Sequence, residues 1–192
     1  MSFLTTLLES HGAQAGEGLA NHLGVPQDKA TGLLTQLGPM ILGAVKNQAG
    51  DDDEKVESLL NEHGDEAAVD DAAAHFAKPD DDGGLAAKAE SLLGSDMGKK
   101  AIDVICDKLG VSESVAQTVL PKIISFVLGA LNKKKGEAGG GSDGMSMVKG
   151  FLDQDGDGSI MDDLGDMLGG GKGDDDDGGG LGGLVGGLLG KK

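Results

Sequence analysis

The chain has no arginine, tryptophan or tyrosine, and its single cysteine is Cys106. Without arginine it cannot make the bidentate guanidinium contacts by which many sites hold phosphate or carboxylate groups. The formal net charge of −17 over 192 residues argues against nucleic-acid binding, because such proteins neutralise phosphates with lysine and arginine. One cysteine also excludes a disulfide within the chain.

Long hydrophobic runs are missing as well. The most apolar stretch covers residues 123–131, whereas a membrane-spanning helix needs about 20 apolar residues, so no transmembrane span is expected. The opening MSFLTTLLES has neither the basic segment nor the apolar stretch of a secretory signal. A cytoplasmic location is therefore predicted, and other export routes stay open. With 2% aromatic residues, any core must consist mostly of Leu, Ile, Val, Ala and Met, a mixture that favours helices.

What the chain does contain is an internal repeat. NHLGVPQDKATGLLTQLGPMILGAVKN begins at residue 21 and DKLGVSESVAQTVLPKIISFVLGALNK at residue 107, an offset of 86 residues without a gap. The repeat pairs Gly24 with Gly110, at positions typical of helix C-caps. It also pairs Gly43 with Gly129 inside an apolar helical phrase, where glycine costs about 1 kcal/mol relative to alanine. A cost that recurs in both copies indicates a close helix–helix contact.

The composition changes after residue 135, since 21 of the 36 glycines lie beyond it. We predict an all-α fold with a duplicated multi-helix domain over residues 1–135. Its two similar copies cover about 1–50 and 88–135, and a helical connector, 51–87, joins them. One copy is small for an independent core, so the copies are expected to bury their apolar faces against each other. Residues 136–192 are predicted to form a Gly/Asp-rich, largely disordered extension.

Several of these segments together resemble a known family. They are LGVSESVAQTVLPKIISFVLGAL, the preceding ESLLGSDMGKKAIDVICDK, the glycine-capped duplication and the LDQDGDGSIMDDLG that follows. This combination resembles the YidB-like family of bacterial helical proteins, a domain of unknown function. The resemblance implies an all-α fold without an assigned activity, and it brings no catalytic residue to carry over.

FLDQDGDGSIMDDLG, at residues 151–165, has much of the pattern of a calcium-binding loop. Acidic side chains at positions 1, 3 and 5 converge on one cation when a glycine at position 6 lets the chain turn sharply. Oxygen ligands are missing at positions 9 and 12, where Met161 and Leu164 stand, so we expect weak binding, with Kd on the order of 10⁻⁴–10⁻³ M. The alternative is a solvated acidic linker. The candidate ligands for Ca²⁺ are Asp153, Asp155, Asp157, the carbonyl of Ser159, and Asp162 and Asp163, which would close a shortened loop.

No other pattern predicts a catalytic or cofactor site. Cys106 and the four histidines have neither zinc-finger nor HExxH spacing, and Cys106 is expected at a small buried position. The chain is therefore predicted to be a non-enzymatic interaction or structural protein that binds a protein partner or itself, with no small-molecule substrate evident. An enzyme of unknown class is the weaker alternative.

The last segment, GGGLGGLVGGLLGKK at residues 178–192, has two interpretations. One is a low-complexity tail without fixed structure. The other is self-association or reversible docking on an apolar surface, since leucines and a valine alternate with glycines. In the second case the protein would be self-assembling or associated with the cell envelope.

Overall fold

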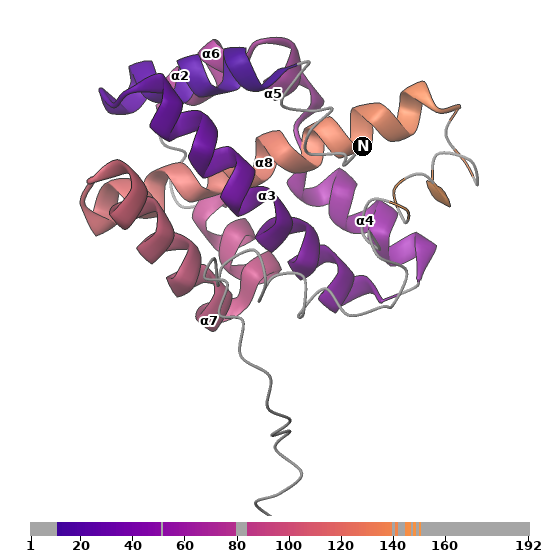
Figure 1. Ribbon diagram of the computed structural model, residues 1–192. Helices are drawn as coiled ribbons and strands as arrows, with labels where there is room; N and C mark the ends of the chain where they lie inside the picture. Colours follow the sequence, from indigo (N-terminus) through magenta and orange to yellow (C-terminus); the bar gives the residue numbers. More distant parts are fainter. Residues whose placement is uncertain are drawn as a thin grey trace, which may run out of the picture.

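The computed structural model describes residues 11–50, 52–79 and 84–139, together with residues 141, 145, 146, 148 and 150. All regular secondary structure in this part of the chain is helical, which confirms the predicted all-α fold (Figure 1). The helices are α2 (Ala13–Leu23), α3 (Gln27–Ala49), α4 (Asp53–His63), α5 (Glu66–Asp70), α6 (Ala72–Ala77), α7 (Gly84–Leu109) and α8 (Glu113–Glu137).

The helix boundaries confirm the repeat. The ends of α2 and α7 are 86 residues apart, and so are the starts of α3 and α8. Between them, Gly24 and Gly110 adopt left-handed conformations with φ of 65° and 70°. Each donates its N–H to a carbonyl in the last turn of the preceding helix, that of Ala20 or Cys106. Glycine fits because it has no Cβ to oppose a positive φ.

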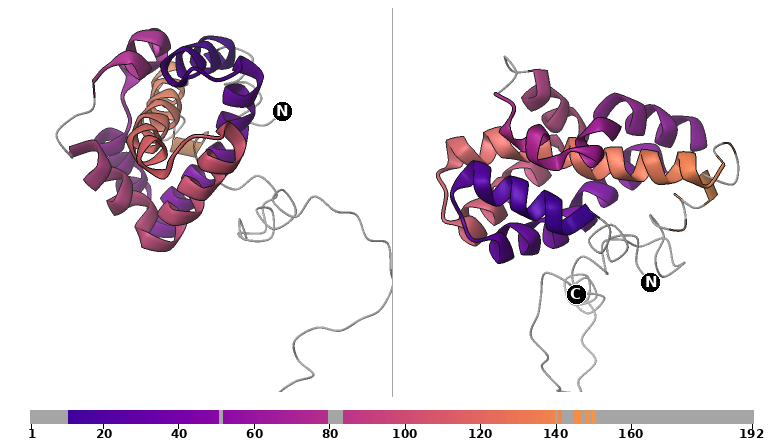
Figure 2. Two further views of the ribbon diagram at one scale, coloured as in Figure 1. Left: turned by 90° about the vertical axis from the view of Figure 1, so that its left-hand side faces the viewer. Right: turned by 90° about the horizontal axis from the view of Figure 1, so that it is seen from above.

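Helix α8 forms the centre of the domain. It contacts α3, α4, α5, α6 and α7, and Figure 2 shows it surrounded by the other helices. Every residue from 119 to 131 is buried, which is typical of a helix enclosed on all sides. Within the described residues α8 is the one helix long and apolar enough to cross a membrane, but 78% of its apolar window is buried in the protein. Its length and composition therefore fit a core helix.

The predicted connector, residues 51–87, is an integral layer of the domain. Helices α4 and α5 pack on α8, while α6 packs on both α2 and α8. Phe76 of α6 is fully buried, and its ring centroid lies 6.0 Å from that of Phe126 in α8. Helices of the first copy and of the connector thus share one core with the second copy.

The close contact predicted at Gly129 is present. A Cβ on Gly129 would overlap the carbonyl of Asp65, and one on Gly64 would lie 2.8 Å from the Gly129 nitrogen. The N–H of Asp65 donates to the carbonyl of Ser125 at 3.0 Å. The turn between α4 and α5 therefore lies directly on the backbone of α8. The matching glycine, Gly43, is buried in α3.

Buried side chains continue past Lys135, where the helical domain was predicted to end. Helix α8 reaches Glu137, and beyond it Met145 and Val148 are almost completely buried. The beginning of the extension is therefore packed against the domain. Residues 151–192 lie outside the described residues.

Candidate interaction groove and a buried polar network

A bend in α7 shapes a groove on the surface of the second copy. Gly94 interrupts the helix with φ 69° and ψ 170°. Residues with a side chain avoid this conformation, which is accessible almost only to glycine. The bend divides α7 into two helical parts, and residues of both parts face a common groove with α8.

The groove has a volume of about 360 Å³, within the usual range of ligand-binding pockets. Its apolar side chains are Ala89, Ile102, Leu120 and Pro121, of which all but the half-buried Ile102 are buried. The other lining residues are small or polar: Glu90, Gly94, Ser95, Gly98, Lys99 and Gln117. An apolar floor with a polar rim suits the binding of a few apolar side chains.

The corresponding helix crossing in the first copy is a close contact. The 86-residue offset pairs Ile102 with Gly16 and Gln117 with Thr31. Helices α2 and α3 meet so closely there that a Cβ on Gly16 would overlap the hydroxyl of Thr31. An isoleucine cannot allow the same approach, because its side chain needs room between the helices. The two copies therefore differ at this helix crossing.

Pro121 adds a polar feature to the groove. It lies inside α8 and has no N–H, so the carbonyl of Gln117 lacks its usual helical donor. The Gln117 side chain donates one N–H to Glu113 at 3.1 Å. A polypeptide segment lying in the groove can supply main-chain N–H groups for the Gln117 carbonyl.

Acidic residues lie near the C-terminal end of α7 and at the start of α8. The pKa of the Cys106 thiol is raised, first by burial and then by the negative charges of Asp103, Glu113 and Asp107. A raised pKa keeps the thiol protonated and poorly nucleophilic. Cys106 is half-buried rather than fully buried as predicted. The carboxylate of Glu113, which accepts a hydrogen bond from the lining residue Gln117, favours cationic groups beside the groove.

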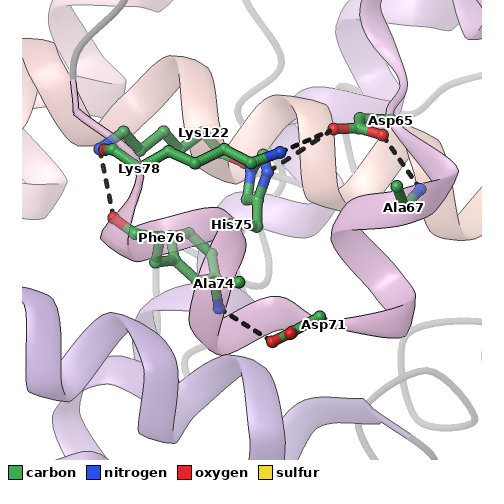
Figure 3. A network of polar contacts seen from close by, with 8 residues as sticks. All are labelled: Asp65, Ala67, Asp71, Ala74, His75, Phe76, Lys78 and Lys122. Atoms are coloured by element: carbon green, nitrogen blue, oxygen red, sulfur yellow. Dashed lines mark hydrogen bonds and ion pairs between the residues drawn. The ribbon is translucent and has the colours of Figure 1, made fainter.

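A second polar arrangement lies where α8 packs against α5 and α6. Lys122 of α8 is 2% exposed, and its amino group donates to the carbonyls of Phe76 and Lys78 at 3.2 and 2.7 Å (Figure 3). These carbonyls belong to the end of α6, where the last C=O groups have no N–H donor within the helix. Lys122 thus caps α6 from within the core.

His75 and Asp65 extend this network. The His75 Nε2 lies 3.0 Å from the carbonyl of Lys122 and, as donor, joins α6 to α8. Its Nδ1 lies 3.8 Å from a carboxylate oxygen of Asp65, too far for a hydrogen bond. The other oxygen of Asp65 accepts the N–H of Ala67 and caps α5. Each polar group here secures a helix end or a helix pair, so the network has a structural role.

Burial holds the pKa of His75 below its usual range, although the Lys122 carbonyl and the Asp65 carboxylate act in the opposite direction. A histidine with a lowered folded-state pKa binds fewer protons than in the unfolded chain, so stability falls as the pH drops through the unfolded value of about 6.5. We expect wild type to lose more stability than His75→Gln between pH 7.5 and 5.5, by at most about 1.4 kcal/mol.

Urea unfolding at the two pH values measures this difference. Equal losses of stability in wild type and His75→Gln would contradict the assignment.

The predicted calcium ligands, Asp153, Asp155, Asp157, Ser159, Asp162 and Asp163, all lie outside the described residues, so the prediction stands as made. Within the described part, no three His, Cys, Asp or Glu side chains gather where they could hold a metal ion. The groove was not predicted, because it depends on the packing distance between α7 and α8. The one feature of the sequence that indicates the groove is that the second copy has Ile102 where the first copy has Gly16.

Comparison with protein families gives one result that bears on the whole chain. The model of a family described as a bacterial protein of unknown function (DUF937) matches residues 5–86 and again residues 91–192. The two matches begin 86 residues apart, the offset of the repeat. Comparisons with curated proteins and with solved structures gave no match.

Proposed function

This chain belongs to the DUF937 family of bacterial proteins of unknown function, which includes YidB. Because the family has no assigned function, we propose one from the surface features of this chain. It is a non-enzymatic interaction protein, and the groove between α7 and α8 binds apolar side chains of a polypeptide segment. The carrying observation is that Ile102 lines this groove in the second copy, whereas its counterpart Gly16 makes a close contact with Thr31 in the first copy.

Two further features favour a polypeptide over a small metabolite. The groove offers apolar volume with little charge at its floor, and the carbonyl of Gln117 at its edge lacks a helical donor. Main-chain N–H groups supply such a donor wherever a segment passes. Gly94 and Gly98 have open space above them, so a backbone can come close.

Photo-crosslinking tests this function in bacterial cells that produce the full chain. A photoreactive amino acid replaces Ser95, which is exposed and lines the groove. We expect adducts to a discrete polypeptide, either another protein or a segment of the same chain. Gly98→Leu in the same chain should abolish the adducts, because a side chain there would enter the groove without striking the protein.

Gly32→Leu is the matched control. Gly32 is also a helical glycine with open space around its Cβ position, but it lies in α3 and does not line the groove. Adducts should therefore persist in Gly32→Leu. If Gly98→Leu and Gly32→Leu leave the adducts equally unchanged, or if no adduct forms, the groove is not an interaction site.

We also propose that the loop from Asp153 to Asp163 binds one calcium ion weakly. The support is its sequence pattern, with carboxylates at positions 1, 3 and 5 followed by glycine. Titration of the full chain by calorimetry should show saturable binding with Kd on the order of 10⁻⁴–10⁻³ M. Asp153→Ala with Asp157→Ala should remove it, whereas Asp174→Ala with Asp176→Ala, in an unpatterned acidic run, should not. Unsaturable uptake by all three proteins would refute the site.

A further inference from the structure

We propose that the occupant of the α7–α8 groove is the chain's own segment of residues 181–192. This proposal rests on the groove function proposed above and names the polypeptide that fills it. The other candidate occupants, a second copy of the chain and an unrelated protein, become outcomes of the test.

The length of chain after the described residues lets this segment reach the groove. Thirty residues separate Gly150 from Leu181, and a glycine-rich stretch of that length has a root-mean-square span of about 30 Å. A folded domain of this size has a radius of gyration of about 14 Å. Any face of the domain is thus within range. Attachment to the same chain gives an effective concentration in the millimolar range, which favours this segment over a second copy at ordinary protein concentrations.

The segment's composition fits the groove. Its apolar residues are Leu181, Leu184, Val185, Leu188 and Leu189, and every other residue before the final lysines is glycine. Such a sequence presents aliphatic side chains for the floor formed by Ile102, Leu120 and Pro121. Its glycines leave main-chain N–H groups unobstructed for the carbonyl of Gln117.

Charge supports the same match. The segment contains no acidic residue and includes Lys191 and Lys192, in a chain whose net charge is −17. The groove has Glu90 on its rim, and the carboxylate of Glu113 accepts a hydrogen bond from the lining residue Gln117. Lysines at the end of the segment gain from these charges, although Lys99 on the rim opposes part of the gain.

Disulfide pairing in the full chain tests the proposal. Ser95→Cys and Leu188→Cys are combined with Cys106→Ala, and mild oxidation is followed on non-reducing gels. We expect an intramolecular disulfide to form about tenfold faster with Gly32→Leu added than with Gly98→Leu added, a difference of about 1.4 kcal/mol in docking. Circular dichroism and urea unfolding establish that both variants are folded.

Three outcomes would overturn the proposal: equal rates in the two variants, no disulfide, or predominantly disulfide-linked dimers, which would make a second copy the occupant. The Ser95 photo-adducts separate this failure from failure of the groove function. Adducts to another polypeptide that still depend on Gly98, without the intramolecular disulfide, leave the groove function standing and refute the tail as occupant. If neither the Ser95 photo-adducts nor the intramolecular disulfide forms, both the groove function and the tail as its occupant are refuted.

Discussion

Gly129→Ala is expected to lower the free energy of unfolding by about 2–3 kcal/mol, although alanine is the better helix former by about 1 kcal/mol. The new Cβ would overlap the carbonyl of Asp65, and the nearest atoms belong to backbone, which cannot move aside as a flexible side chain would. Relief requires the α4–α5 turn to withdraw from α8. That movement weakens the hydrogen bond from the Asp65 N–H to the carbonyl of Ser125.

Gly136→Ala is the matched control in the same helix. Gly136 has no atom within 4 Å of its Cβ position, so only the propensity gain remains. We expect stability to rise by about 0.5–1 kcal/mol. Chemical denaturation of wild type and both variants measures the two shifts. Stabilisation by both substitutions would mean that α8 and the α4–α5 turn are not in backbone contact.

The repeat made this contact predictable from the sequence. Gly43 and Gly129 stand at matching positions in apolar helical phrases, where a glycine is costly unless a neighbour needs the space. The C-caps at Gly24 and Gly110 were predictable for a similar reason, because a local backbone requirement selects glycine. The partner of Gly129 was not predictable, since the Asp65 turn lies in the segment interpreted as a connector. Which surfaces meet depends on long-range packing that periodicity does not encode.

The groove illustrates the same limit. The inner helix boundaries coincide in the two copies, yet the distance between paired helices depends on the side chains at the crossing. Gly16 permits contact with Thr31, whereas Ile102 occupies the corresponding space in the second copy. The difference is visible in the sequence once the repeat is aligned, but its consequence appears only when α7 and α8 are placed. The proposed binding surface thus depends on a side-chain difference between the two copies.

Lys122 is a further residue whose role the sequence concealed. It precedes the most apolar stretch of the chain, and a lysine at such a place is usually exposed. In the fold its amino group lies at the end of α6 and donates to the carbonyls of Phe76 and Lys78. The aliphatic stem is buried along the way, so the residue contributes through packing as well as through hydrogen bonds.

Lys122→Ala and Lys122→Met separate these two contributions. We expect Lys122→Ala to lower the free energy of unfolding by about 3–4 kcal/mol, since it leaves a cavity and removes the donor of a buried carbonyl. Lys122→Met retains most of the stem and should cost about 1–2 kcal/mol, because relief from burying the amino group offsets part of the lost hydrogen bonding.

Lys78→Ala is the appropriate control, because its side chain is 60% exposed and its amino group lies 4.0 Å from the carboxylate of Asp65. Exposed ion pairs contribute little, so this change should stay within about 0.5 kcal/mol of wild type. Urea unfolding of the three variants at neutral pH gives the comparison. If Lys122→Ala cost no more than Lys78→Ala, the end of α6 would not depend on Lys122. The predicted order, with Lys122→Met between the other two, requires both the packed stem and the amino group to hold α6 against α8.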